Sequence, residues 1–197
     1  VATKARALSS RLLATYPVPL APSKAPDPKR GAMLYVQNCA SCHGSNGNGL
    51  GPDAAKLDPP PIAFLDADRA RERSPFALYQ VISQGLDGTS MRGFAELSSQ
   101  DRWALAFYAG RFAFTDSEKG EKLWKSDAGL RNSIPDLAAL AGLTPEALGR
   151  QIGQPKADAV LAYWRALPEA LMKTSAGSLS VARDRLRESL AAYAAGD

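Results

Sequence analysis

The chain of 197 residues carries a net charge of +4 at neutral pH, and 45% of its residues are hydrophobic, so it can build one large domain or two small ones. Its longest apolar stretches, near residues 103–109 and 137–141, are far shorter than the roughly 20 residues that a membrane-spanning helix needs. Basic residues are interleaved with acidic ones, which argues against a nucleic-acid-binding surface. We therefore expect a globular chain that neither enters a membrane nor binds nucleic acid.

The start of the chain is rich in proline. Residues 1–26 hold a short amphipathic stretch and then two proline-rich segments, which predict an extended lead-in over the following domain. Asp27 as N-cap and Pro28 at the first helical position predict a helix that leads into a cysteine pair.

The only two cysteines and the only histidine of the chain form the run Cys39-Ala40-Ser41-Cys42-His43. This spacing is the attachment signature of a c-type haem. The two thiols add to the haem vinyl groups, and the imidazole beside the second thiol can reach the iron as an axial ligand. The alternatives are a zinc half-site, which would need a second Cys or His cluster, and a thioredoxin-like redox pair, which would need a βαβ context. The motif therefore predicts one covalently bound haem c and leaves no cysteine for a disulfide.

The rest of the first half alternates between loops and helices. Residues 44–51 are rich in glycine and asparagine, and residues 52–61 show no helical periodicity, so both predict loops. Ser74 and Pro75 predict the start of a helix that Gly85 ends. A loop with a methionine follows, and then a capping-box pattern that opens a helix at 98–110. No segment shows sustained strand alternation, so we expect an all-α fold.

Residues 27–112 resemble a class I cytochrome c domain. The matching positions are the cysteine motif, Gly31, Tyr35, Gly51, Pro52, Met91, Leu105 and Tyr108. The resemblance implies a class I cytochrome c fold in which the first and last helices cross tightly, with Gly31 against the face of Leu105 and Tyr108.

The sixth iron ligand is expected to be one of the three methionines, because a thioether raises the reduction potential of haem iron. Met33 lies too close to Cys39 to reach the opposite haem face, and Met172 lies in a polar tail. Met91 follows a turn-rich loop and precedes the last helix, as the distal methionine of the resembled family does. The predicted axial pair is therefore His43 and Met91.

Further haem contacts are also expected. The family places a proline carbonyl on the second ring nitrogen of the axial histidine, which Pro52 matches, with prolines 59–61 as substitutes. Arg92, beside Met91, is a candidate partner for a haem propionate, and a solvated arginine is the alternative. The apolar walls, which are equally what any small core contains, are expected from Leu57, Ile62, Phe64, Leu78, Val81, Ile82, Phe94 and Leu97.

Residues 115–170 look like a degenerate, haem-less copy of the first domain. The segments 120–124, 135–140, 144–154 and 160–164 follow the patterns of 31–35, 60–65, 74–84 and 104–108. The copy drops most of the loop after the haem motif and the whole methionine loop. The alternative is a set of unrelated amphipathic helices with similar caps. Residues 175–197 predict a charged C-terminal helix that leads to a following domain.

The whole arrangement is similar to the cytochrome domains fused before the membrane part of bacterial high-affinity iron permeases. This resemblance rests on residues 58–61, 91–97, 101–108 and 191–197 and on the haem-less half. It implies a periplasmic electron-transfer protein, not an enzyme, that accepts electrons from ferrous iron oxidation. Its partners would be redox proteins and a permease portion after Asp197, which would make the chain the head of an inner-membrane protein.

Three other functions compete with this interpretation. The chain could be a free soluble electron shuttle, a cytochrome subunit of a respiratory or dehydrogenase complex, or a haem enzyme or sensor with an open sixth site. An enzyme would need acid–base groups near the iron, and the only histidine is already used as a ligand.

Overall fold

The computed structural model describes residues 8, 11, 20–169 and 171. The predicted C-terminal helix at 175–197, Met172 and most of the lead-in lie outside this part. Within it, all regular structure is helical apart from an isolated antiparallel bridge between Gly85 and Arg92. The expected all-α fold is confirmed.

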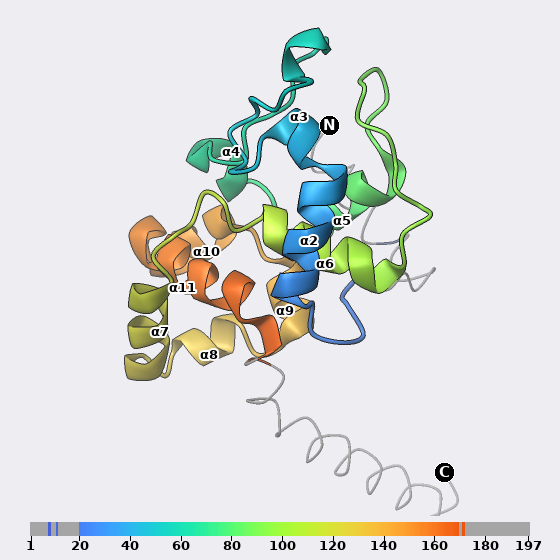
Figure 1. The fold of residues 1–197 in the computed structure, drawn as a ribbon. Helices are drawn as coiled ribbons and strands as arrows, with labels where there is room; N and C mark the ends of the chain where they lie inside the picture. The colour runs from blue at the N-terminus through green and yellow to red at the C-terminus, as the bar shows by residue number, and fades with distance from the viewer. Residues whose placement is uncertain (1–7, 9–10, 12–19, 170, 172–197) are drawn as a thin grey trace, which may run out of the picture.

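Between residues 20 and 112, the structure contains five α-helices and one 3-10 helix, which form the first half (Figure 1). In chain order they are α2 (Pro28–Asn38), α3 (Ala40–His43), η1 (Ala54–Lys56), α4 (Ala67–Arg71), α5 (Pro75–Gln84) and α6 (Ser99–Ala109). The predicted N-caps are confirmed, because side-chain oxygens of Asp27, Ser74 and Ser98 accept backbone N–H groups of α2, α5 and α6. The short helices η1 and α4 were not predicted.

The capping box predicted at the start of α6 is only half present. Ser98 accepts from the Asp101 amide at 3.0 Å, but the Asp101 carboxylate does not return to the cap. It instead accepts from Nε and Nη2 of Arg30 on α2, at 2.8 and 2.9 Å. This two-pronged ion pair ties the first helix of the half to its last helix.

Between residues 113 and 167, which belong to the second half, the further helices are α7 (Ser117–Ser126), α8 (Leu130–Ser133), α9 (Leu137–Gly142), α10 (Pro145–Ile152) and α11 (Gln154–Ala166). Thr144 caps α10 through the Ala147 amide, as Ser74 caps α5 through the Ala77 amide. Gly153 then leads directly into α11, whereas residues 86–98 separate α5 from α6. The methionine loop is therefore missing from the second half, as the sequence predicts.

Both halves contain a close crossing of their first and last helices over a glycine. A Cβ on Gly31 of α2 would lie 2.5 Å from the Ala104 carbonyl oxygen and 2.9 Å from Tyr108 Cβ. A Cβ on Gly120 of α7 would clash with the Ala159 carbonyl oxygen, and it would lie 2.9 Å from Tyr163 Cβ. In each half the glycine therefore meets a carbonyl and, one helical turn later, a tyrosine.

These crossings correct two details of the sequence analysis. Gly31 lies against Ala104 and Tyr108 and not against Leu105, because residues four apart share one helix face. The expected match of 160–164 with 104–108 is shifted by one residue, since Tyr163 and not Trp164 is the counterpart of Tyr108. Trp164 instead packs edge-on against Trp124 at a centroid distance of 4.8 Å.

The interior of the second half is filled with aliphatic side chains. Those that are at most 6% exposed include Leu130, Ile134, Leu137, Leu140, Ala141, Leu148 and Leu161. They come from α8, from the residue directly after it, and from α9, α10 and α11, and they belong to one continuous core with buried side chains of the first half.

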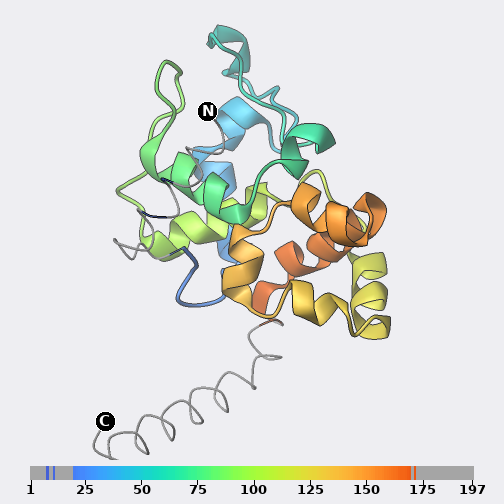
Figure 2. The ribbon, with the colours of Figure 1, turned by 180° about the vertical axis from the view of Figure 1, so that it is seen from behind.

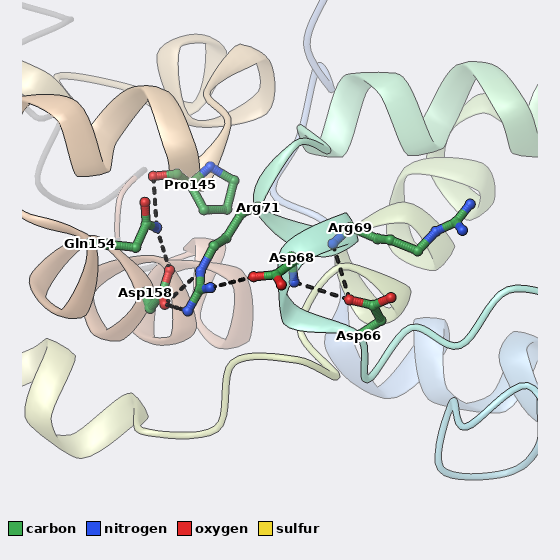
Figure 3. A network of polar contacts seen from close by, with 7 residues as sticks. All are labelled: Asp66, Asp68, Arg69, Arg71, Pro145, Gln154 and Asp158. Carbon is green, nitrogen blue, oxygen red and sulfur yellow. Dashed lines mark hydrogen bonds and ion pairs between the residues drawn. The ribbon is translucent and has the colours of Figure 1, made fainter.

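The two halves pack against each other, with α9 on α5 and α11 on α6 (Figures 1 and 2). A polar network joins them beside this contact (Figure 3). Arg71 of α4 donates to Asp158 of α11 at 2.8 Å and to Asp68 of its own helix, also at 2.8 Å. Gln154 donates to the other Asp158 oxygen at 2.7 Å and to the Pro145 carbonyl at 3.2 Å.

Candidate functional site

The cysteine motif lies at the end of α2 and on α3. Cys39 is the residue at which α2 ends, and Cys42 and His43 belong to the short helix α3. Both thiols are free and half-buried, and burial raises the pKa of the Cys39 thiol to about 12. The motif therefore presents two free thiols and an imidazole on one short segment.

The orientation of His43 follows from one contact. Its Nδ1 lies 3.1 Å from the carbonyl oxygen of Ile62. A carbonyl oxygen can only accept, so Nδ1 carries the proton and the lone pair of Nε2 is available to a metal. Burial also lowers the pKa of His43, so the ring is neutral at pH 7, which is the form that binds a metal.

The prediction that the Pro52 carbonyl accepts from His43 Nδ1 was wrong. The neighbouring Gly51 lies against the backbone of α3, where a Cβ would meet the carbonyl oxygens of Ala40 and Ser41. Gly51 also donates to the Cys42 carbonyl at 3.1 Å. Pro52 is thereby held beside the backbone of α3, and the acceptor is supplied by the residue directly after the proline run at 59–61.

Aromatic rings surround the histidine. The Phe64 ring stacks on His43 with 4.6 Å between centroids, and Phe112 stacks on Phe64 at 6.2 Å. The Tyr35 ring lies 5.0 Å from Phe112, and its buried hydroxyl donates to the Gly44 carbonyl at 2.9 Å. Tyr35 therefore fixes the backbone directly after His43, a role that the sequence analysis did not assign.

Replacing Tyr35 by phenylalanine is expected to lower the free energy of unfolding by about 1–3 kcal/mol, because the Gly44 carbonyl would stay buried without its partner. Denaturant unfolding of the two proteins measures the difference. Tyr79→Phe is the matched control, since its hydroxyl contacts Ser99 Oγ in an exposed position and its loss should cost less than about 0.5 kcal/mol. Equal losses in both variants would contradict the role of Tyr35.

Met91 is held in a closed turn. The Leu86 amide donates to the Met91 carbonyl at 2.9 Å, and the Met91 amide donates to Thr89 Oγ1 at 3.1 Å. Gly85 and Arg92 form the bridge at the base of this turn. The Met91 side chain is half-buried and packs against the core.

The expected wall residues differ in burial. Ile82 and Phe94 are 7% and 5% exposed, Leu57, Phe64, Leu78, Val81 and Leu97 are half-buried, and Ile62 is 40% exposed. Arg92 is exposed, and its Nη1 lies 2.6 Å from Glu96 Oε1. Its guanidinium carbon lies 4.2 Å from the centre of the Phe94 ring. The charge of Arg92 is thus already paired with a neighbouring carboxylate.

The donor set and its surroundings fit a covalent haem. Two free thiols at the attachment spacing would supply the two covalent linkages of haem c, and an imidazole with its Nε2 lone pair available would supply one iron ligand. Four large apolar side chains on segments linked to these groups are exposed, as expected where a flat apolar cofactor would cover them. Val36 lies on the helix that leads to Cys39, Leu50 lines a pocket with Ala40 and Ser41, Ile62 accepts from His43, and Leu86 belongs to the turn of Met91.

The alternative chemistries find no support in the described part of the chain. No group of three or more His, Cys, Asp or Glu residues there could hold a metal ion, as a zinc site would require. Strands are also missing from these residues, so the βαβ context of a thioredoxin-like pair is not formed.

Comparison with known protein families gives a match in the first half of the chain. Residues 26–108 match the family model described as cytochrome C oxidase, cbb3-type, subunit III. Comparison with curated proteins returns no match. The matched residues include α2 to α6 and contain the cysteine motif, His43 and Met91.

Residues 26–108 therefore form a class I c-type cytochrome domain with an all-α cytochrome c fold. It binds haem c covalently and has a haem-based electron-transfer role. Its partners are redox proteins, and c-type cytochromes are typically extracytoplasmic. In the part of the chain that the structure describes, we find no helix that is long and apolar enough to cross a membrane.

Proposed function

We propose that the chain is a periplasmic carrier of single electrons with one haem, whose iron is ligated by His43 and Met91. The observation that supports the proposal is the 3.1 Å contact between His43 Nδ1 and the Ile62 carbonyl, which leaves the Nε2 lone pair available to bind iron. Bound haem c supplies a one-electron iron couple. The chain has a single attachment motif, which supports one haem.

The residues around the site support electron transfer over catalysis. Phe64 covers one face of the His43 ring, and the turn at 85–92 holds Met91 through one backbone hydrogen bond from Leu86 and one hydrogen bond to the Thr89 hydroxyl. A fixed ligand pair changes little between oxidation states, which favours fast transfer of an electron. His43 is the only histidine of the sequence, so none remains for the acid–base role that a peroxidase requires.

The test is a redox titration of the purified, haem-loaded protein, followed by addition of carbon monoxide to the ferrous form. We expect a one-electron transition and no rapid binding of carbon monoxide, since Met91 blocks the sixth position. Rapid binding would overturn the carrier proposal and favour an enzyme or sensor with an open site.

For the electron source we propose ferrous iron, because the chain resembles the cytochrome domains that precede iron permeases. In this setting the haem would accept the electron that ferrous iron loses before transport, and the permease portion would follow Asp197. The second candidate is a cytochrome subunit of a respiratory complex, which the description of the matched family favours.

Anaerobic mixing of the ferric protein with two electron sources separates these candidates. Ferrous iron, alone and with a periplasmic extract, is compared with a quinol–cytochrome c oxidoreductase, and haem absorbance reports reduction. Reduction by ferrous iron supports the iron-linked proposal. Reduction by the oxidoreductase without any reduction by ferrous iron would contradict the iron-linked proposal and support the respiratory role.

A further inference from the structure

A guanidinium group from the second half is buried at its contact with the cytochrome domain. Arg165 of α11 is 1% exposed. Its Nη1 donates to the Gly110 carbonyl at 2.7 Å, its Nη2 donates to the Arg73 carbonyl at 3.0 Å, and its Nε is buried without a partner. The guanidinium carbon lies 5.4 Å from the centre of the Phe114 ring.

This cation is not neutralised by an ion pair with any carboxylate in the described part of the chain. The nearest acidic influence is Asp158, whose oxygens are occupied by Arg71 and Gln154. Partial compensation comes from Gly110, because it ends α6 and the C-terminus of a helix carries partial negative charge. Burial lowers the pKa of Arg165 to about 10, so the group remains charged at neutral pH.

The position of Arg165 relates it to the axial ligand. Arg165, Ile62 and Phe64 line one small cavity between the two halves. Ile62 holds His43 Nδ1 through its carbonyl, and Phe64 stacks on the His43 ring. Asp66, Arg69 and Arg73 also line this cavity but are exposed, so Arg165 is the buried charge that shares the cavity with the two residues that contact the imidazole.

We infer that Arg165 raises the reduction potential of the haem, so that the haem-less half sets the driving force of the cytochrome domain. Reduction removes one positive charge from the iron, and a cation in a poorly polarisable interior favours the state with less positive charge. This inference rests on the proposed electron-transfer function. Arg165 would act on the cofactor through the electric field of its charge and is not an iron ligand.

The test compares the midpoint potentials of the haem-loaded wild type, Arg165→Met and Arg165→Lys. Arg165→Met is expected to lower the ratio of reduced to oxidised protein at a fixed potential at least threefold. For a one-electron couple this corresponds to a midpoint potential lower by about 28 mV. Arg165→Lys keeps the positive charge but cannot make the paired hydrogen bonds of the guanidinium group. Its unfolding temperature should therefore fall, while its reduction potential stays near that of the wild type. The Met shift should persist in 0.5 M salt, because mobile ions do not screen a buried charge.

Arg71→Gln is the matched control. It breaks an ion pair between the same two halves, but the Arg71 side chain is 32% exposed, so any effect on the potential should disappear in 0.5 M salt. An unchanged potential in a folded Arg165→Met protein would overturn the inference. If Arg165→Met does not fold, Arg165→Lys is the test. A threefold change in its ratio of reduced to oxidised protein would overturn the inference, and a potential equal to that of the wild type despite its lower stability would support the inference. A wild type that does not titrate as a one-electron couple would instead refute the proposed function.

Discussion

Replacing Met91 by alanine is expected to lower the reduction potential by roughly 0.1–0.3 V, a part of the range of about 0.8 V over which axial ligands tune haem. The thioether is a soft ligand that stabilises the reduced iron, and alanine leaves the sixth position to water or an external ligand. Redox titration measures the shift. The oxidised spectrum should also lose the charge-transfer band of thioether ligation, and the ferrous form should gain rapid carbon monoxide binding.

Met33→Ala is the control for this substitution. Met33 lies on α2 and is 53% exposed, so its loss should leave the spectrum and the potential unchanged. A Met91→Ala protein with the wild-type spectrum and potential would show that Met91 is a packing residue and that another group holds the sixth position.

Replacing Gly120 by alanine is expected to lower the free energy of unfolding of the second half by about 3 kcal/mol or more. The added Cβ would overlap the Ala159 carbonyl oxygen and approach Tyr163 Cβ, and a helix backbone cannot move aside as a flexible side chain can. Tryptophan fluorescence in a Trp103→Phe background reports this half, since the two remaining tryptophans, Trp124 and Trp164, pack beside the crossing. Haem absorbance reports the cytochrome domain separately.

Gly142→Ala is the matched control, because its added Cβ would meet no heavy atom within 4 Å apart from its chain neighbours and the backbone of its own helix. This change at the end of α9 should alter the stability by less than about 1 kcal/mol and can raise it, since alanine reduces the freedom of the unfolded chain. If Gly120→Ala were as mild as Gly142→Ala, the crossing of α7 and α11 would not be the tight contact that relates the second half to the first.

Local features of the fold could be predicted from the sequence because neighbouring residues create them. Asp27, Ser74 and Ser98 cap helices through amides two or three residues ahead, so a short run of sequence contains the whole interaction. The same holds for Gly85, whose φ of 78° ends α5. The helices η1 and α4 were missed because they are single turns without a periodic apolar pattern.

The register of the second half could not be predicted in this way. Pairing aromatic residues by type matched Tyr108 with Trp164. The crossing requires the tyrosine that lies one turn beyond the close carbonyl, which is Tyr163. Sequence similarity records residue types, whereas the register depends on which helix face meets the glycine.

The sequence by itself determined the covalent attachment of haem c and the all-α class, and it predicts His43 as an axial ligand and a second half without the methionine loop. Each of these features is encoded by adjacent residues. Only the tertiary structure decided that Ile62 and not Pro52 holds His43, and that Arg165 is buried near them. The His43 partner is a backbone carbonyl, which every residue possesses, and the burial of Arg165 depends on Arg73 and Gly110, far away in the chain. Such interactions have no signature in the sequence, since they arise only when distant segments pack together.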